Sequence, residues 1–168
     1  HRAFFQAISS TSNGGAICVI ESSFTISVIG TGFLKCSNTG GIGGALYGDV
    51  LESVVDNGCF DQCICNHGDN AFFITNQKRN PNIVKNTNIL RCCEDKNSGG
   101  RAANMENGIL VHSYSNYSYG YVGSGNGIFR LYNPTSAKSN FNIYCLIRCK
   151  AVNSLHGTSL SPVQLSNL

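Results

Sequence analysis

The sequence predicts an all-β fold, a right-handed, single-stranded parallel β-helix of about six coils, which forms one domain over residues 1–168. Two signals recur about every 28 residues: a glycine-rich turn, and an apolar residue followed three places later by Cys. In addition, no segment shows the sustained 3.6-residue apolar spacing of a helix. A single coil cannot bury its inward side chains alone, so we expect this chain to be a piece of a longer solenoid.

The turn signal supplies the first estimate of the period. It opens as Gly-Gly-Ala-Ile at 14–17, returns as Gly-Gly-Ala-Leu at 43–46, and continues in looser forms. The markers are separated by 29, 26, 30, 27 and 30 residues, a mean of about 28. Gly, Asn and Asp suit corners because they adopt positive φ at low cost. The predicted turn markers are Gly14, Gly43, Asp69, Gly99, Asn126 and His156.

The cysteine signal keeps the same period. Cys36 and Cys63 are 27 residues apart, and Cys63 and Cys92 are 29 apart. The offset between the two signals is also constant, since Cys36 precedes Gly43 by 7 residues and Cys149 precedes His156 by 7. Stacked coils would place these side chains above one another as a buried column, because unbonded Cys behaves as a small apolar residue. The predicted core ladder is Ile8, Cys36, Cys63, Cys92 and Cys149.

Composition excludes some functions. Only 12% of the residues are charged, the net charge is +3, and no block of like charges occurs, so nucleic-acid binding is not indicated. No run of 18 apolar residues exists, so we expect no membrane insertion by this segment. Nine cysteines are an odd number, which leaves at least one thiol unpaired if all disulfides are internal. We favour a partly reduced thiol ladder.

The repeated motifs resemble those of a known family. Gly-Gly-Ala-Ile at 14–17 and Gly-Gly-Ala-Leu at 43–46, with Phe-x-x-Cys segments, are similar to the GGA(I/L/V) and FxxN repeats of polymorphic outer-membrane proteins. Here Cys stands where that family has Asn. The resemblance is best over residues 33–71 and implies a pectin-lyase-like β-helix used in adhesion or surface display.

One cysteine cluster could in principle bind a metal. Cys59, Cys63, Cys65 and His67 offer four soft ligands for zinc. The alternative is that Cys63 and Cys65 face inward and stack with neighbouring coils, which the period explains without a metal. We therefore expect no metal and no cofactor.

The acidic residues suggest an enzymatic alternative. Glu21, Asp49 and Glu106 follow their turn markers by 6 or 7 residues, with Asn76 and Asn133 at the equivalent places between and after them. An acid and base pair needs two carboxylates at a defined separation in different environments, and a polar turn column explains the pattern more simply. We predict no catalytic residues, and keep a carbohydrate-active enzyme, such as a polysaccharide lyase or hydrolase, as an alternative.

A tyrosine-rich tract is the candidate binding region. Tyrosine and serine together provide adaptable surfaces for protein or glycan recognition. The competing interpretation is a strand whose alternating tyrosines pack on neighbouring coils. Within the tract, Asn116-Tyr117-Ser118 fits the N-glycosylation pattern. The predicted binding residues are Tyr114, Tyr117, Tyr119 and Tyr121.

These observations favour a non-catalytic structural or adhesive β-helix module that contacts a protein or a glycan, outside the cell or at its surface. The second alternative is an intracellular scaffold, such as part of a cytoskeletal assembly, which suits free thiols equally well. Nine reduced cysteines and an unmodified Asn116 would argue against the surface location.

Overall fold

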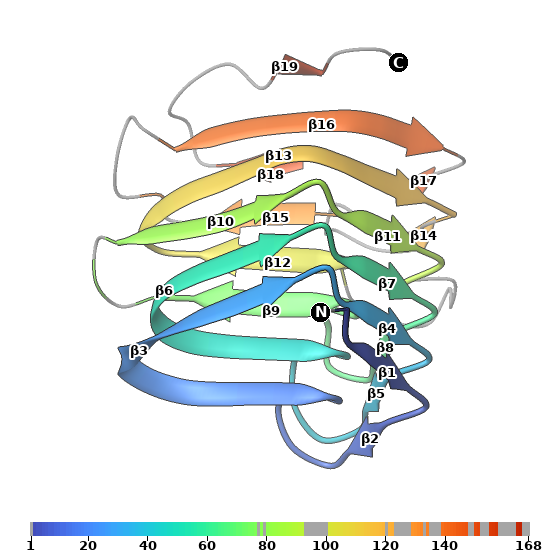
Figure 1. The fold of residues 1–168 in the computed structure, drawn as a ribbon. Helices are drawn as coiled ribbons and strands as arrows, with labels where there is room; N and C mark the ends of the chain where they lie inside the picture. The colour runs from blue at the N-terminus through green and yellow to red at the C-terminus, as the bar shows by residue number, and fades with distance from the viewer. Residues whose placement is uncertain are drawn as a thin grey trace.

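The computed structural model describes residues 2–76, 78, 80–92, 101–119, 121–122, 129–132, 134, 139–147, 150–151, 155–157 and 164–165. Within these residues all regular structure is β-strand, and the strands pair in parallel between successive turns of the chain (Figure 1). The single-stranded parallel β-helix predicted from the sequence is therefore confirmed.

Each coil presents three faces, and the first face carries the longest stack of strands. Residues 17–21 of β3 (Ile17–Ile29) pair with residues 46–50 of β6 (Leu46–Asp56), and residues 46–49 of β6 pair in turn with β9. The stack then passes through further strands in register. These strands are β9 (Phe72–Thr75), β12 (Ala103–Glu106), β15 (Phe129–Tyr132) and β18 (Leu155–Gly157).

The second face begins where the long strands bend. Residues 25–29 of β3 and 52–56 of β6 lie on it, followed by β10 (Pro81–Lys85) and residues 109–113 of β13 (Ile109–Ser118). The stack ends with β16 (Asn140–Ile147) and β19 (Gln164–Leu165).

The third face, which we call the short-strand face, consists mostly of three-residue strands. They are β1 (Phe4–Gln6), β4 (Gly32–Leu34), β7 (Cys59–Asp61) and β11 (Asn88–Leu90), followed by residues 116–118 of β13 and 145–147 of β16. Paired positions are 27 to 29 residues apart, as in the series Phe4, Gly32, Cys59, Asn88, Asn116 and Cys145.

Two small sheets lie at the corner after the short-strand face. One contains β2 (Ser9–Ser10), β5 (Ser37–Asn38) and β8 (Ile64–Cys65), and the other pairs β14 (Tyr121–Val122) with β17 (Lys150–Ala151). In the part of the chain that the structure describes, about four turns are complete, from Phe4 to Asn116. The sequence predicted about six coils from its six turn markers, a small difference, and strand pairing continues beyond the complete turns in less complete layers.

The Gly-Gly-Ala turn has a clear physical basis. Gly14 and Gly43 have φ of 69° and 76°, in the left-handed region that glycine adopts without strain. The second glycine has a different role, because a Cβ on Gly44 would lie 2.0 Å from the carbonyl oxygen of Asn70 in the next coil. Ala45, the third residue, is fully buried. The motif therefore permits a sharp turn and close approach of successive backbones.

The core is a set of columns that run along the solenoid. Phe33 stacks on Phe5 at 5.3 Å and on Phe60 at 4.7 Å between ring centroids, each pair within 8° of parallel. Ile89 and Tyr117 continue this column at the paired positions of the next two coils. Phe33, Phe60, Ile89 and Tyr117 are each at most 1% exposed. Stacking equivalent positions therefore buries large side chains that no single coil could bury.

Candidate binding face

The short-strand face is bordered by two columns of residues in the left-handed conformation. Few non-glycine residues adopt positive φ, and bulky ones do so only when the surrounding structure holds them there. From Gly30 to Asn86 in one column, and from Ala7 to Arg91 in the other, the backbone N–H donates a hydrogen bond to a carbonyl of the next coil, as from Asn86 to Ser113. One column is Gly30, Asn57, Asn86 and Tyr114, and the other is Ala7, Lys35, Gln62, Arg91 and Tyr119.

Tyrosine stands at the same level in both columns. Tyr114 has φ of 51° and is 59% exposed, and Tyr119 has φ of 56° and is 46% exposed. Tyr114 and Tyr119 flank residues 116–118 of β13, which are the part of this strand that lies on the short-strand face. This coil therefore presents one large aromatic side chain at each border of the face, whereas the positive-φ positions of the described coils below it carry no aromatic residue.

Polar groups link the coils between these borders. The side-chain amide of Asn116 donates to Oδ1 of Asn88 in the coil below, at 2.8 Å. Arg91 Nε donates to Asp61 Oδ1 at 2.9 Å, and a second guanidinium nitrogen contacts Asp61 Oδ2, so the ion pair is bidentate. Both pairs are partly exposed. The face thus offers amide, guanidinium and carboxylate groups in fixed positions.

The opposite border contains a second ion pair. Asp56 Oδ1 accepts a hydrogen bond from the Asn86 amide at 2.9 Å, and Oδ2 lies 3.3 Å from Lys85 Nζ. The Asn86 hydrogen bond, with Lys85 beside it, lowers the pKa of the Asp56 carboxyl. This carboxylate is therefore ionised at neutral pH, one residue before the left-handed column at Asn57.

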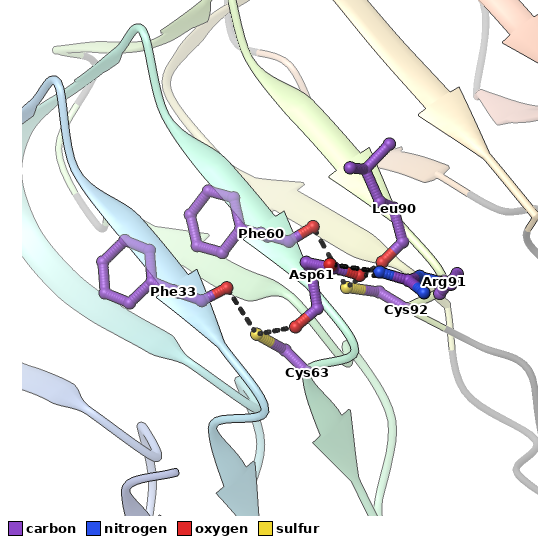
Figure 2. Close-up of polar contacts among 7 residues, drawn as sticks. All are labelled: Phe33, Phe60, Asp61, Cys63, Leu90, Arg91 and Cys92. Carbon is purple, nitrogen blue, oxygen red and sulfur yellow. Dashed lines mark hydrogen bonds and ion pairs between the residues drawn. The ribbon is translucent and has the colours of Figure 1, made fainter. Parts of the chain in front are cut away.

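A buried column of thiols lies at the corner behind the face. Cys36, Cys63 and Cys92 are each at most 1% exposed, and each follows its left-handed residue by one position. Cys63 Sγ donates to the carbonyl of Phe33 in the coil below at 3.6 Å, and Cys92 Sγ donates in the same way to Phe60 at 3.6 Å. Figure 2 shows this repetition, with Arg91 turned toward Asp61 beside it.

Within the described residues these cysteines are free thiols: Cys18, Cys36, Cys59, Cys63, Cys65 and Cys92. The neighbouring Cys63 thiol, and then burial, raise the pKa of the Cys36 thiol. A raised pKa suppresses the reactive thiolate. The column is thus a packing element, and within the described part of the chain no group of three or more His, Cys, Asp or Glu side chains is placed to hold a metal.

Several predicted residues need correction. Tyr117 is 1% exposed and its hydroxyl lies 3.1 Å from His112 Nε2, so it belongs to the core and cannot contact a partner. Ile8 occupies the ladder position below Cys36 but is 41% exposed, because no described coil lies beneath it. His156 lies inside β18, opposite Arg130, and not at a turn.

Other predicted residues have a simpler outcome. Asp69, like Gly14 and Gly43, has positive φ, at 58°. Asn116, the candidate glycosylation site, lies in β13 with its amide bonded to Asn88. Tyr121 lies in β14. The remaining candidates Gly99, Asn126 and Cys149 lie outside the described residues.

The predicted carboxylate column is only partly correct. Asp49 and Glu106 share one column on the first face, with Thr75 between them. Glu21 is paired with Val50, one position further along, and so belongs to another column. Asn76, assigned to this series from the sequence, is fully buried and donates to the carbonyl of Leu51 at 2.9 Å. Asn133 lies outside the described residues.

Glu106 is engaged by two neighbours on the first face. Its Oε1 accepts from the Asn104 amide at 2.9 Å and lies 3.4 Å from a guanidinium nitrogen of Arg130. The paired positions of Asp49 and Glu106 are two coils apart, about 10 Å along the solenoid. This is wider than the spacing of the two carboxylates in a retaining glycosidase, about 5 Å.

The left-handed columns were not predicted from residue types. Their members include Ala, Lys, Gln, Arg and Tyr, which share no preference for positive φ. The sequence signal that could have found them is the cysteine period, because Lys35, Gln62 and Arg91 each precede a Cys of the predicted ladder.

Comparison of the chain with models of protein families, with curated proteins and with solved structures finds no match. Among the described residues, no helix has the length and apolar character needed to cross a membrane.

Proposed function

We propose that this chain is a non-catalytic β-helix module that binds a glycan through its short-strand face, at a cell surface or outside the cell. The observation that carries the proposal is the pair of exposed tyrosines, Tyr114 and Tyr119, held in the left-handed conformation at the two borders of one coil. Strained residues of this kind concentrate at ligand-binding sites.

The chemistry of the face supports a polar, uncharged or weakly charged ligand. Tyrosine offers an apolar ring for the C–H groups of a sugar and a hydroxyl for its oxygens. The Asn88–Asn116 amides and the Arg91–Asp61 pair add donors and acceptors at neighbouring positions. Most charges on this side are already paired, which argues against a highly charged partner.

The decisive experiment is glycan-array binding by the chain and by a double variant, Tyr114→Asn with Tyr119→Gln. The coils below carry Asn57 and Asn86 in one column and Gln62 in the other, so both substitutions use residues that the fold already accepts at equivalent positions. We expect binding to fall about tenfold or more, since Tyr side chains dominate contacts of this type.

Tyr132→Gln is the matched control. Tyr132 is 45% exposed but lies in β15 on the first face, so its replacement should leave binding unchanged. If no glycan on the array is bound, or if the double variant binds as well as the unaltered chain, the proposal is wrong. Cleavage of a bound glycan, detected by mass spectrometry of the products, would favour the carbohydrate-active alternative.

A further inference from the structure

Two exposed aromatic rings mark the ends of one short stretch of backbone. Tyr114 and Tyr119 stand at the two borders of the short-strand face, and residues 116–118 between them are extended and paired with β11. Five peptide units separate the two tyrosines, so their Cα atoms lie at most about 17 Å apart. A single sugar ring is much shorter than this span, so a monosaccharide reaches only one of the two rings.

The side chains between the tyrosines alternate in direction. Ser115 is fully buried and Tyr117 is 1% exposed, so Asn116 between them points outward, and it is half-buried. The Asn116 side-chain amide donates to Oδ1 of Asn88 in the coil below at 2.8 Å, which holds it in place. An amide has a second N–H and an oxygen that can bond to a hydroxyl group. We call Tyr114, Asn116 and Tyr119 the tyrosine platform.

The described coil below the tyrosine platform is less suited to hold the length of a ligand. Its border positions are Asn86 and Arg91, neither of which has an aromatic ring. Their polar groups are used within the solenoid, because Asn86 donates to Asp56 at 2.9 Å and Arg91 makes a bidentate ion pair with Asp61. A ligand that ran along the solenoid axis would also leave one tyrosine ring uncovered.

We propose that the ligand is a straight, uncharged, β-1,4-linked oligosaccharide of at least about three units, which lies along β13 from Tyr114 to Tyr119, perpendicular to the solenoid axis (Figure 1). This inference rests on the proposed glycan binding and adds the class, the length and the direction of the glycan. Chains of β-1,4-linked glucose or N-acetylglucosamine are straight ribbons whose C–H groups suit the tyrosine rings. Asn116 bonds to a hydroxyl of the sugar between the two rings.

Calorimetry with two series of oligomers tests the length of the ligand. Cellobiose to cellohexaose are the glucose probes, and chitobiose to chitohexaose are the N-acetylglucosamine probes. We expect the affinity to rise about tenfold or more between the dimer and the tetramer, where the second tyrosine is reached, and then to level off. The series that binds more tightly identifies the sugar. Equal affinity for dimer and hexamer, or a steady rise up to the hexamer, contradicts the proposal.

Single variants give a signature that a structural role of the tyrosines would not produce. Tyr114→Asn and Tyr119→Gln should each lower the affinity for the tetramer to that for the dimer, because one ring remains. The affinity for the dimer should fall by only about twofold, since a dimer binds at either ring of the unaltered chain. A variant that weakens dimer and tetramer by the same large factor contradicts the two-ring arrangement.

Substitutions in the coils below test the direction of the ligand. Lys35→Ala and Gln62→Ala remove side chains from the column of Tyr119 without altering β13, and should leave the affinity for the tetramer unchanged. If Gln62→Ala costs as much affinity as Tyr119→Gln, the ligand runs along the solenoid axis and the proposal is wrong.

Asn116→Ala tests the middle of the tyrosine platform. It should lower the affinity for the tetramer about fivefold, because one hydrogen bond to the sugar is lost. Asn88→Ala is the matched control: it breaks the same contact between coils, leaves the Asn116 amide in place, and should cost less affinity. The reverse order of the two effects would remove Asn116 from the proposed site. The chain must be produced without N-glycosylation, since a sugar attached to Asn116 would cover the platform.

The failure of this inference can be told apart from the failure of the proposed function. An array on which only branched glycans or monosaccharides bind, with Tyr114 and Tyr119 required, contradicts the inference and leaves the proposed function intact. Absence of binding to every glycan on the array and to every oligomer contradicts both.

Discussion

Ile8 and Cys36 occupy the same position in successive coils, yet Ile8 is 41% exposed and Cys36 is fully buried. The difference does not come from the side chains, because isoleucine is the larger apolar residue. It comes from stacking: Cys36 lies between two coils, whereas Ile8 has a coil on one side only among the described residues. In a solenoid, therefore, the stability of a position depends on its neighbours along the axis.

The largest expected contrast concerns phenylalanines on the short-strand face. Phe60→Ala should lower the free energy of unfolding by about 3–5 kcal/mol, because Phe60 is fully buried and stacks on Phe33. Phe4→Ala should change it by no more than about 0.5 kcal/mol, because Phe4 is 64% exposed. Denaturant titration of both variants gives the comparison, and similar losses would show that the first coil is as well packed as the third.

Acid should weaken the stacked region through His112. Burial lowers the pKa of this histidine to about 3, against 6.5 for the free group. Between these values the unfolded chain binds a proton that the folded chain does not, so stability is full above pH 6.5 and falls as the pH drops toward 3. The slope should approach about 1.4 kcal/mol per pH unit.

Denaturant titrations between about pH 4 and pH 8, which cover most of that window and the plateau above it, measure this slope. The double variant His112→Phe with Tyr117→Phe removes both members of the buried hydrogen bond together and should flatten the profile. An unchanged slope in the double variant would assign the acid sensitivity to other groups.

The cysteines should show the same difference between the exposed first coil and the stacked coils. Cys63→Ala should cost about 1–3 kcal/mol, since Cys63 is fully buried between coils, whereas Cys18→Ala on the exposed part of β3 should be nearly neutral. Iodoacetamide should modify Cys18 in the folded chain and reach Cys36, Cys63 and Cys92 only after unfolding. Equal alkylation rates for Cys18 and Cys63 would contradict the buried column.

The smallest expected effect has the opposite sign. Tyr114→Asn should raise the free energy of unfolding by about 1 kcal/mol, because Asn tolerates the left-handed region that Tyr114 occupies at φ 51°. If glycan binding falls in the same variant, Tyr114 lowers the stability of the wild-type fold but is needed for binding. A loss of stability would mean that the tyrosine ring makes packing contacts that outweigh the backbone strain.

The sequence predicted the fold because its period is marked by residues with strict steric roles. Gly14, Gly43 and Asp69 stand where the backbone turns through positive φ, and Cys36 and Cys63 are fully buried at equivalent positions of stacked coils. Such constraints leave a repeating trace in the chain, and the period derived from it agrees with the 27 to 29 residues of the paired strands.

The candidate binding face was harder to predict, because a shift of one residue in the strand decides whether a side chain points into the core or into solvent. Tyr117 and Tyr119 are two residues apart, yet one lies in the core and the other is exposed, since a left-handed residue ends the alternation of the strand. The same sensitivity moved Glu21 out of the column of Asp49. Periodicity fixes the length of a coil, but it does not reveal where each corner begins.

The left-handed columns give this protein a surface that can change independently of its fold. At Ala7, Lys35, Gln62 and Arg91 the backbone N–H donates a hydrogen bond to the next coil, while the side chains differ widely in size and charge. One site is offered about every 4.8 Å along the axis. Substitutions there could alter the ligand one coil at a time, so a new specificity could arise by point mutation in a scaffold whose interior is unchanged.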